Sequence, residues 1–330
     1  RGDFARAAET KQKLARAEER ADAKFRLFVE AAELWSSRVR NLDKAIVALE
    51  EARDIKPDDP WVLHSLVGAY GDRQQWHKLA ATLRALAAVE EPEERRTKTL
   101  YALAKLTWKK LREPTTAGQI FEEVLDLDPR HPTAFERVVA IHLEVGDFRA
   151  LAGAYRRMIL RLRELSSPEV DELKHSLFHE LGCVLRDHLQ QPKSALEAFA
   201  VAVQLKPEAD DDRRHMAELQ ASLGDMPQAI ATTRERITRQ PLAGSAYREL
   251  AELLFRQGDY DRAYTVLDVL THLGEAGEQH QRFLYDYPPM PLTDIPGTLA
   301  HAAWPSHVLH PKLDRVLTAL FRAVVGAVRR

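Results

Sequence analysis

One stretch of the chain decides the fold: residues 246–270 read AYRELAELLFRQGDYDRAYTVLDVL. Apolar side chains recur at i, i+3, i+4 and i+7 before the central Gly-Asp pair, and the same spacing returns after it, from Ala263 to Leu270. Gly258 suits a tight turn, and Asp259 suits the cap of the helix that follows. The stretch therefore predicts two amphipathic helices joined by a short turn, which is a helical hairpin.

The hairpin pattern repeats along the chain. Turns with the same Gly-Asp pair begin at Gly2, Gly146, Gly224 and Gly258, and three turns without the glycine precede Ala45, Ala117 and Ala195. The equivalent small or apolar positions are Ala7, Ala45, Leu79, Ala117, Leu151, Ala195, Ala229 and Ala263, at steps of 38, 34, 38, 34, 44, 34 and 34 residues. Residues 27–60 also match residues 99–132 at an offset of 72, which indicates that the duplicated unit was a pair of repeats. We expect the 44-residue step to reflect a longer second helix, Ala150 to Leu165, before a cap at Ser167.

A 34-residue step made of two helices is the period of the tetratricopeptide-repeat (TPR) family, and the chain resembles that family over almost its whole length. The signature residues of the family fall on Tyr247, Leu250, Ala251, Leu254, Gly258, Tyr260, Ala263 and Leu267, and its closing proline falls on Pro57, Pro129, Pro207 and Pro241. The resemblance implies an all-α fold, a right-handed superhelical solenoid of antiparallel helix pairs over residues 1–284, with a half-repeat and about seven repeats. Because one hairpin cannot bury its apolar stripe alone, neighbouring repeats must stack.

The repeat pattern ends near residue 284. Six prolines from Pro288 to Pro311 forbid a continuous helix, and the apolar residues among them are too many for a free linker. We expect residues 285–311 to form an extended proline-rich segment packed on the solenoid. Residues 312–330 carry a helical apolar stripe and are expected to form an amphipathic helix, the start of a further domain.

Composition excludes several classes of protein. The chain has 48 Lys and Arg against 50 Asp and Glu, so its net charge of -2 gives no strong overall attraction for nucleic acid or anionic membranes. It has no apolar run of about 18 residues that would span a bilayer. Cys183 is its only cysteine, which excludes an internal disulfide framework and a multi-cysteine zinc module. The start at Arg1 indicates a processed or excised segment, so the compartment stays open, with the cytoplasm favoured.

The search for catalytic chemistry is negative. No phosphate-binding loop, dinucleotide glycine pattern or nucleophile elbow occurs, so we expect no enzyme activity and no cofactor. The nearest motif is His179-Glu180-Leu181-Gly182-Cys183, which resembles a zinc-protease helix, but the repeat register already accounts for Leu181 and Gly182. The histidines at 301, 307 and 310 are loosely spaced and are expected to be solvated, so no metal site is expected. The charge run Asp210–Asp212 is explained by the positive end of a helix dipole.

Ligand-facing positions come from the TPR resemblance, which implies that first helices line a concave groove. These positions are Lys98, Tyr101, Lys105, Trp108 and Lys109 in the third repeat, then His179, Arg186, Arg214, Arg248 and Arg256 in later repeats. The cations and aromatic rings of the third repeat suit an acidic or aromatic peptide. The alternative is an ordinary solvated helix face, with Trp108 packed under the Pro114 turn. We expect no clamp of the kind that binds chaperone tails, because that clamp uses asparagines on first helices and Asn41, the only asparagine here, lies in a turn.

The sequence thus favours a non-enzymatic scaffold or adaptor that binds a partner protein or peptide in its groove. No small-molecule substrate, nucleic acid or membrane insertion is expected. The paired repeats are similar to the long TPR arrays of large proteins from gliding and predatory bacteria, some of which belong to motility complexes. The alternative is the regulatory or targeting region of an enzyme whose catalytic domain lies outside this segment. RNA binding by a helical-repeat array is a third hypothesis, against which the net charge counts.

Overall fold

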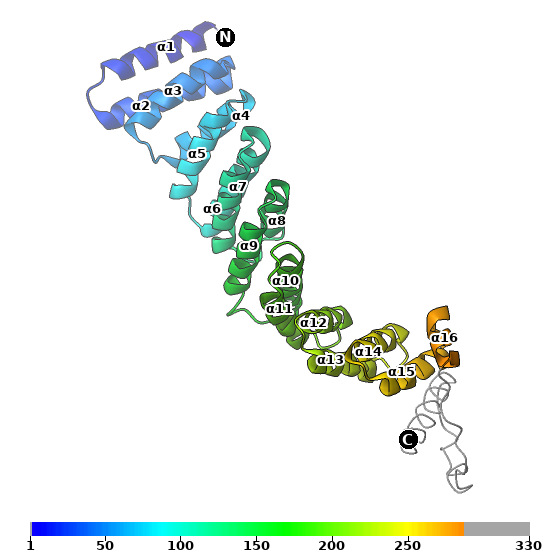
Figure 1. Cartoon of the computed structure of the whole chain (residues 1–330). Helices are drawn as coiled ribbons and strands as arrows, with labels where there is room; N and C mark the ends of the chain where they lie inside the picture. Colours follow the sequence, from blue (N-terminus) through cyan, green and yellow to red (C-terminus); the bar gives the residue numbers. More distant parts are fainter. Residues whose placement is uncertain (1, 287–330) are drawn as a thin grey trace, which may run out of the picture. The chain divides into compact units, whose positions relative to one another are not determined.

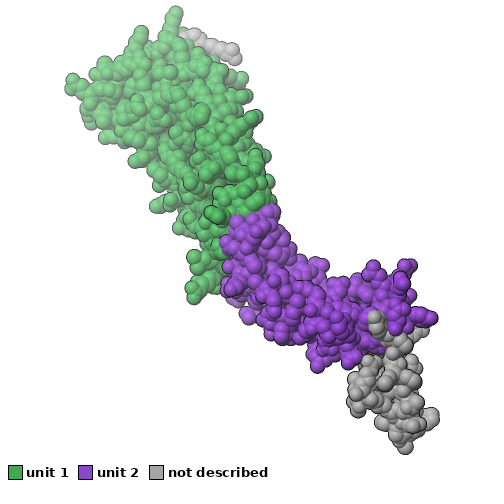
Figure 2. All heavy atoms as spheres, in the orientation of Figure 1, with its two compact units in different colours: residues 1–164 green, residues 165–330 purple. Residues whose placement is uncertain are grey.

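A computed structural model describes residues 2–286 of the chain, and every regular element in that range is helical (Figure 1). None of these helices combines the length and the apolarity needed to cross a bilayer. The chain divides into two compact units, residues 1–164 and residues 165–330 (Figure 2). The predicted proline-rich segment from residue 287 onward and the predicted helix at 312–330 lie outside the described residues.

Unit 1 is a single helix, α1 (Gly2–Ala17), followed by four helix pairs, each with a first and a second helix. The pairs are α2 (Ala21–Glu33) with α3 (Leu42–Ile55), α4 (Pro60–Asp72) with α5 (Trp76–Val89), α6 (Glu93–Leu106) with α7 (Pro114–Leu127), and α8 (Ala134–Val145) with α9 (Phe148–Arg161). Each helix packs on the next one along the chain. The unit is therefore a row of stacked helical hairpins.

Two first helices of unit 1 end in a wider, π-helical turn. The turn η1 (Leu34–Val39) follows α2, and η2 (Thr107–Leu111) follows α6. Both lie inside 38-residue steps and take up part of the extra length. Helices α3 and α7 have the same bounds at an offset of 72, and so do α5 and α9. After α1, unit 1 therefore consists of two successive four-helix blocks, in agreement with the offset of 72 in the sequence.

Unit 2 contains three helix pairs and a last short helix within the described part. The pairs are α10 (Pro168–Asp187) with α11 (Pro192–Leu205), α12 (Asp210–Ser222) with α13 (Met226–Arg239), and α14 (Gly244–Gln257) with α15 (Tyr260–His272). The short helix α16 (Glu278–Asp286) packs on α15 and places Phe283 edge-on to Phe255, with ring centroids 5.0 Å apart. From α11 onward, corresponding helices begin 34 residues apart.

The expected origin of the 44-residue step between Leu151 and Ala195 is wrong. The second helix α9 ends at Arg161 and has the ordinary 14 residues, whereas the first helix α10 has 20. The extra length lies in α10, which begins at Pro168 and continues to Asp187. The cap predicted at Ser167 is confirmed, since its side chain accepts a hydrogen bond from the amide of Val170 at 3.3 Å.

The turns between first and second helices share one backbone feature. Seven residues with left-handed φ angles between 51° and 87° each lie five positions before the buried small or apolar residue of a second helix. They are Arg40, Gln74, Arg112, Gly146, Gln190, Gly224 and Gly258. The residue after the turn caps the second helix in four cases: Asn41, Asp147, Asp225 and Asp259 each accept a hydrogen bond from an amide three residues later. The prediction that the Gly-Asp pairs form turn and cap is thus confirmed for three repeats.

Ion pairs connect the second helices of unit 1 from one repeat to the next. Lys44 on α3 lies 2.6 Å from Glu9 on α1, and Lys78 on α5 lies 2.7 Å from Glu50 on α3. The further pairs are Arg16–Glu51, Arg84–Glu123, Arg157–Glu122, Arg161–Glu122 and Arg161–Asp126. These seven pairs link α1, α3, α5, α7 and α9 in order, and we refer to them as the second-helix ladder.

Candidate functional site

The predicted ligand residues of unit 1 all lie on α6 and η2, but they differ in exposure. Lys98, Lys105 and Lys109 are exposed, whereas Tyr101 and Trp108 are half-buried. Lys98 forms an exposed ion pair of 2.5 Å with Glu94, one turn earlier. The amphipathic pattern explains this arrangement, because Leu100, Leu103, Ala104 and Thr107 occupy the buried side of the same helix.

The two aromatic rings of this group are held by residues of the next repeat. The hydroxyl of Tyr101 shares a hydrogen bond of 2.8 Å with that of Thr133, and its ring stacks on His131 with centroids 4.6 Å apart. Trp108 donates from Nε1 to Glu144 on α8 at 3.2 Å, and the Arg137 guanidinium lies 5.8 Å from its ring centre. These contacts place Trp108 against α8. The alternative considered from the sequence was that Trp108 packs under the turn at Pro114. Tyr101 and Trp108 thus join neighbouring first helices.

The predicted residue His179 of unit 2 belongs to a cluster around a buried carboxylate. Asp212 on α12 has a side chain only 1% exposed, and it accepts hydrogen bonds from two histidines of α10. His175 Nε2 donates to one oxygen at 2.8 Å, and His179 Nδ1 donates to the other at 2.7 Å. The carboxylate therefore has both oxygens satisfied, as a buried charge requires, and it fastens α10 to α12.

Cys183 extends the same cluster by one helical turn. Its sulfur lies 3.7 Å from His179 Nε2, so Cys183, His179 and Asp212 follow one another as a nucleophile, a base and an orienting acid do in some enzymes. Burial, however, raises the pKa of the Cys183 thiol, which keeps its proton at neutral pH. Across residues 2–286, no group of three or more His, Cys, Asp and Glu side chains is arranged to hold a metal ion. The geometry thus describes a helix-to-helix contact rather than an activated thiolate.

The predicted arginines of unit 2 lie along the first helices α10, α12 and α14. Arg186 Nη1 donates to His215 Nδ1 at 2.6 Å and its guanidinium also binds Asp187. Arg214 lies 3.3 Å from Asp211, and Arg248 donates to the backbone oxygen of Glu275 at 3.4 Å. Arg256 is exposed, with no ion-pair partner in the described part of the chain. These arginines and His179 therefore occupy one succession of first helices, and Arg186 and His179 touch the neighbouring helix directly.

We call this surface the first-helix face: the exposed and half-buried side chains of α6, η2 and α8 in unit 1, and separately those of α10, α12 and α14 in unit 2. Sequence reasoning missed His215 as part of it, and it missed the buried Asp212 that binds His175 and His179. It treated Asp212 as one of three charges at a helix start, although only Asp211 of that run is exposed. The spacing of His175 and His179 could have indicated the cluster, because it places both rings on one side of the helix. Buried ring nitrogens there need a polar partner on the neighbouring helix.

Sequence reasoning also missed a buried ion network between α12, α13 and α14. The Arg236 side chain is 2% exposed and binds both oxygens of Asp210 at 2.9 and 2.8 Å, and it also donates to Glu249. The Arg236 guanidinium lowers the pKa of Asp210, whereas burial raises the pKa of Glu249. The network ties two successive repeats together behind the first-helix face.

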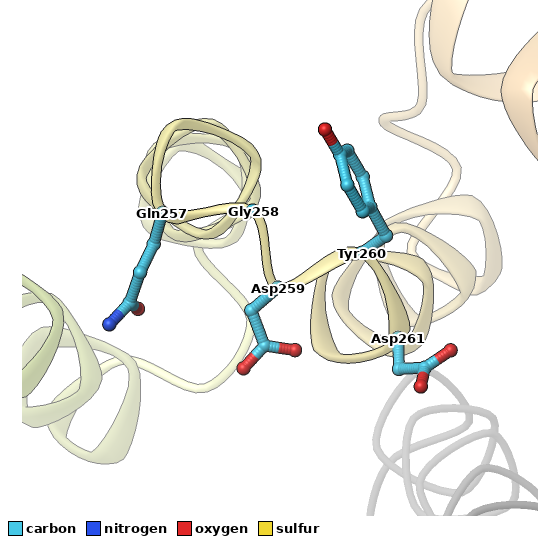
Figure 3. Close-up of a pocket in the computed structure, with 5 residues that line it drawn as sticks. All are labelled: Gln257, Gly258, Asp259, Tyr260 and Asp261. Carbon is cyan, nitrogen blue, oxygen red and sulfur yellow. The ribbon is translucent and has the colours of Figure 1, made fainter.

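Two hollows of the described surface lie at repeat turns. Figure 3 shows the hollow lined by residues 257–261, in which Gln257, Asp259 and Tyr260 project from the turn between α14 and α15. Asp259 is occupied as the cap of α15, accepting from the Arg262 amide at 3.2 Å, and Tyr260 is 61% exposed. A second hollow lies at the turn before α11, lined by residues 191–194 and Leu223. Both are shallow features of the turn and carry no convergent set of unsatisfied polar groups.

The repeat geometry now identifies the fold. Helix pairs of 13 and 14 residues recur every 34 residues in unit 2, and each left-handed turn precedes a buried small or apolar residue by five positions. The repeats are TPR-like. Gly182 lies where α10 packs closely on its paired helix α11. A Cβ added at this position would come 2.8 Å from the ring of Phe199 on α11.

No protein-family model and no curated protein matches the TPR-like chain, but solved structures resemble parts of it. YrrB, described as a TPR protein with an unusual peptide-binding site, has 17% identity and a TM-score of 0.39, over 57% of this chain and 91% of its own. The C-terminal part of a TPR repeat-containing protein from Cytophaga hutchinsonii has 16% identity and a TM-score of 0.38, over 79% and 99%. MamA has 16% identity and a TM-score of 0.37, over 61% and 98%.

Proposed function

We propose that this chain is a non-enzymatic scaffold that binds a partner protein or peptide on its first-helix face. One observation carries the proposal: first helices of neighbouring repeats touch through their side chains, in unit 1 between η2 and α8 and in unit 2 between α10 and α12. Trp108–Glu144 makes this connection in unit 1, and His179–Asp212 and Arg186–His215 make it in unit 2. The surface still presents exposed cations at Lys105, Lys109 and Arg256.

The chemistry of this face suits binding better than catalysis. The clustered groups His175, His179 and Asp212 satisfy one another, and the Cys183 pKa is raised where a nucleophile would need it lowered. Half-buried aromatic and arginine side chains are the residue types that contribute most to protein interfaces. The function as a scaffold therefore uses the face as it stands, without a cofactor or a metal.

Site-specific photo-crosslinking tests the proposal. A photoreactive amino acid replaces Lys105 or Arg256 on the first-helix face in the full chain, expressed in the source cells. The matched controls replace Arg149 on α9 and Glu197 on α11, exposed residues of second helices. We expect discrete crosslinked partner bands at positions 105 or 256 and none at 149 or 197. Equal crosslinking at all four positions, or crosslinks on second helices alone, would refute the first-helix face as the binding surface.

We further propose that the chain works inside a larger protein or assembly, of which a motility complex is one example. Mass spectrometry of the crosslinked bands checks this, because it names the partner. Components of one assembly support it, and a set of unrelated single proteins counts against it. The alternative, a regulatory region of an enzyme, predicts that the crosslinked peptide comes from a catalytic domain encoded in the same reading frame.

A further inference from the structure

One segment of the first-helix face is far more basic than the rest of the chain. Residues 95–112 contain seven cations and no aspartate or glutamate, although the whole chain has slightly more acidic than basic residues. The cations are Arg95, Arg96, Lys98, Lys105, Lys109, Lys110 and Arg112. The imbalance is local, so net charge does not reveal it.

Five of these cations form one series: four lie along α6 and η2, and the fifth, Arg112, directly follows η2. Arg95, Lys98, Lys105, Lys109 and Arg112 are all exposed, and within α6 the spacings of 3 and 7 residues from Arg95 to Lys98 and Lys105 are those of one helical ridge. From Arg95 to Lys105 the ridge covers about 15 Å at the rise of an α-helix, and it continues over η2 to Arg112. Lys110, by contrast, lies on another side, with its ammonium 5.1 Å from the Trp76 ring centre. We call these five residues the basic ridge.

The chain itself does not neutralise the basic ridge. Lys98 alone has a carboxylate partner among the described residues, Glu94 in its own helix, and that pair is exposed. The second-helix ladder of the same unit is different, since its cations meet carboxylates of the neighbouring repeat. Unit 1 thus balances charge between its second helices and leaves positive charge uncompensated on α6.

The neighbourhood of the ridge favours a protein segment over a nucleic acid or a lipid surface. Trp108 lies between Lys105 and Lys109, half-buried, and offers an apolar surface beside the charges. The exposed carboxylate of Glu144 lies at its edge, and Glu113 follows the ridge directly. These carboxylates would repel a broad or continuous polyanion, whereas a narrow segment along α6 avoids them.

We propose that the basic ridge binds an acidic segment of a partner protein, with carboxylates spread along α6 and η2 and an apolar side chain against Trp108. This inference rests on the proposed function and adds the chemistry of the partner. Complementary charge along one helix steers the encounter and sets the register, so binding weakens as salt is added. The apolar contact at Trp108 then accounts for the part of the affinity that salt does not remove.

Fluorescence anisotropy with the full chain tests the proposal directly. The probe is a labelled 18-residue helical peptide with glutamates at every third or fourth position and one central leucine, and its counterpart has glutamine at each glutamate. We expect the acidic peptide to bind at least tenfold more tightly than the glutamine peptide. Its affinity should fall as salt is raised from 50 to 300 mM, because salt screens the charge pairs. Absence of binding, or equal binding of both peptides, overturns the proposal.

Matched variants locate the binding. Lys105→Glu with Lys109→Glu should weaken binding of the acidic peptide at least tenfold. Lys105→Gln with Lys109→Gln removes the charges without reversing them and should weaken binding less. Arg149→Glu with Arg156→Glu changes the same charge on exposed positions of α9 and should leave affinity within twofold. Equal loss in the α9 variant would mean attraction by net charge alone and overturns the ridge. Tighter binding of a labelled single-stranded RNA or of anionic vesicles also overturns it, in favour of those ligands.

The two proposals fail in different ways. If crosslinks form on the first-helix face in cells while the acidic peptide does not bind, the scaffold stands and the acidic partner is refuted. If the acidic peptide binds at the ridge but crosslinks appear on second helices alone, the ridge chemistry stands and the proposed binding face is refuted.

Discussion

Arg40 and Arg112, 72 positions apart, have the same left-handed backbone conformation with φ at 58°. Each directly follows a π-helical turn, and each precedes a second helix that begins two residues later. An arginine in this conformation is strained, because its Cβ approaches the following carbonyl. Its recurrence at one position in both blocks means that the geometry of the turn is imposed by repeat stacking and not by the residue in it.

Glycine at such a turn should therefore stabilise the chain. We expect Gln190→Gly, at φ 51°, to raise the free energy of unfolding by about 0.5 to 1 kcal/mol, measured by urea denaturation. The reverse change, Gly258→Ala at φ 82°, should lower it by about 1 kcal/mol, although nothing lies within 4 Å of the added Cβ. A loss of stability in Gln190→Gly would show that the Gln190 side chain adds more to the free energy of unfolding than its left-handed backbone conformation removes.

Gly182→Ala should be destabilising by packing alone. Its Cβ would meet the ring of Phe199 at 2.8 Å, and because Phe199 is fully buried, the ring or the helix must shift. We expect a loss of about 1 to 3 kcal/mol in the free energy of unfolding. Gly68→Ala on α4 is the matched control, since nothing lies within 4 Å of its Cβ, and it should gain about 0.5 to 1 kcal/mol. Equal effects in both variants would contradict a close helix crossing at Gly182.

Arg236→Met should destabilise unit 2 strongly. Methionine fills part of the volume but leaves Asp210 and Glu249 without their cation in a partly buried site, at a cost of about 3 kcal/mol. Arg239→Met, three residues later, removes an exposed pair with Glu235 and should cost less than about 0.5 kcal/mol. Thermal melts of both variants check the difference. Similar melting temperatures would mean that the network is not the connection between these repeats.

Acidification should weaken unit 2 through His215. Burial, followed by the nearby Arg186, lowers the pKa of His215 below its ordinary 6.5, and Arg186 donates to the ring nitrogen that a proton would occupy. Glu218 opposes this shift and Arg214 adds to it. Below pH 6.5 the unfolded chain therefore binds more protons than the folded one, so stability present above that pH is lost as pH falls toward the lower folded value.

The measurement for His215 is the free energy of unfolding in urea at pH 7.5 and pH 5.5. His215→Gln keeps an acceptor for Arg186 and should show a smaller loss between the two pH values than the unmodified chain. His77→Gln, an exposed histidine on α5, should leave the loss unchanged. Burial also lowers the pKa of His142 in unit 1, so part of the pH dependence should remain in both variants. An unchanged loss in His215→Gln would contradict the assignment.

Much of the fold could be predicted from the sequence because each repeat carries its own turn and crossing residues. Ala117, Ala195 and Ala263 are fully buried where the register places them. The π-helical turns could not be predicted, since Thr107–Leu111 has the composition of an ordinary helix end. The length of α10 was also missed, because the 44-residue step alone does not show which of its two helices holds the extra residues.

The candidate site was predictable only in part. Repeat register assigned Lys105, Lys109 and Arg256 to first helices, and their use in binding stays a prediction. It could not show that Asp212 is buried between two histidines, because a charge at a helix start is satisfied equally well by the helix dipole. Nor could it pair Arg236 with Glu249, since such contacts depend on how successive hairpins stack.

The second-helix ladder also has a mechanical consequence. Its ion pairs cross between repeats and not within them, so added salt should act on the stacking of hairpins while leaving each hairpin intact. Unit 1 is then held more firmly along its second helices than along α6, whose cations repel one another. The bending stiffness of unit 1 would depend on ionic strength, and an acidic ligand bound to α6 would raise it by neutralising the repulsion between the cations of that helix.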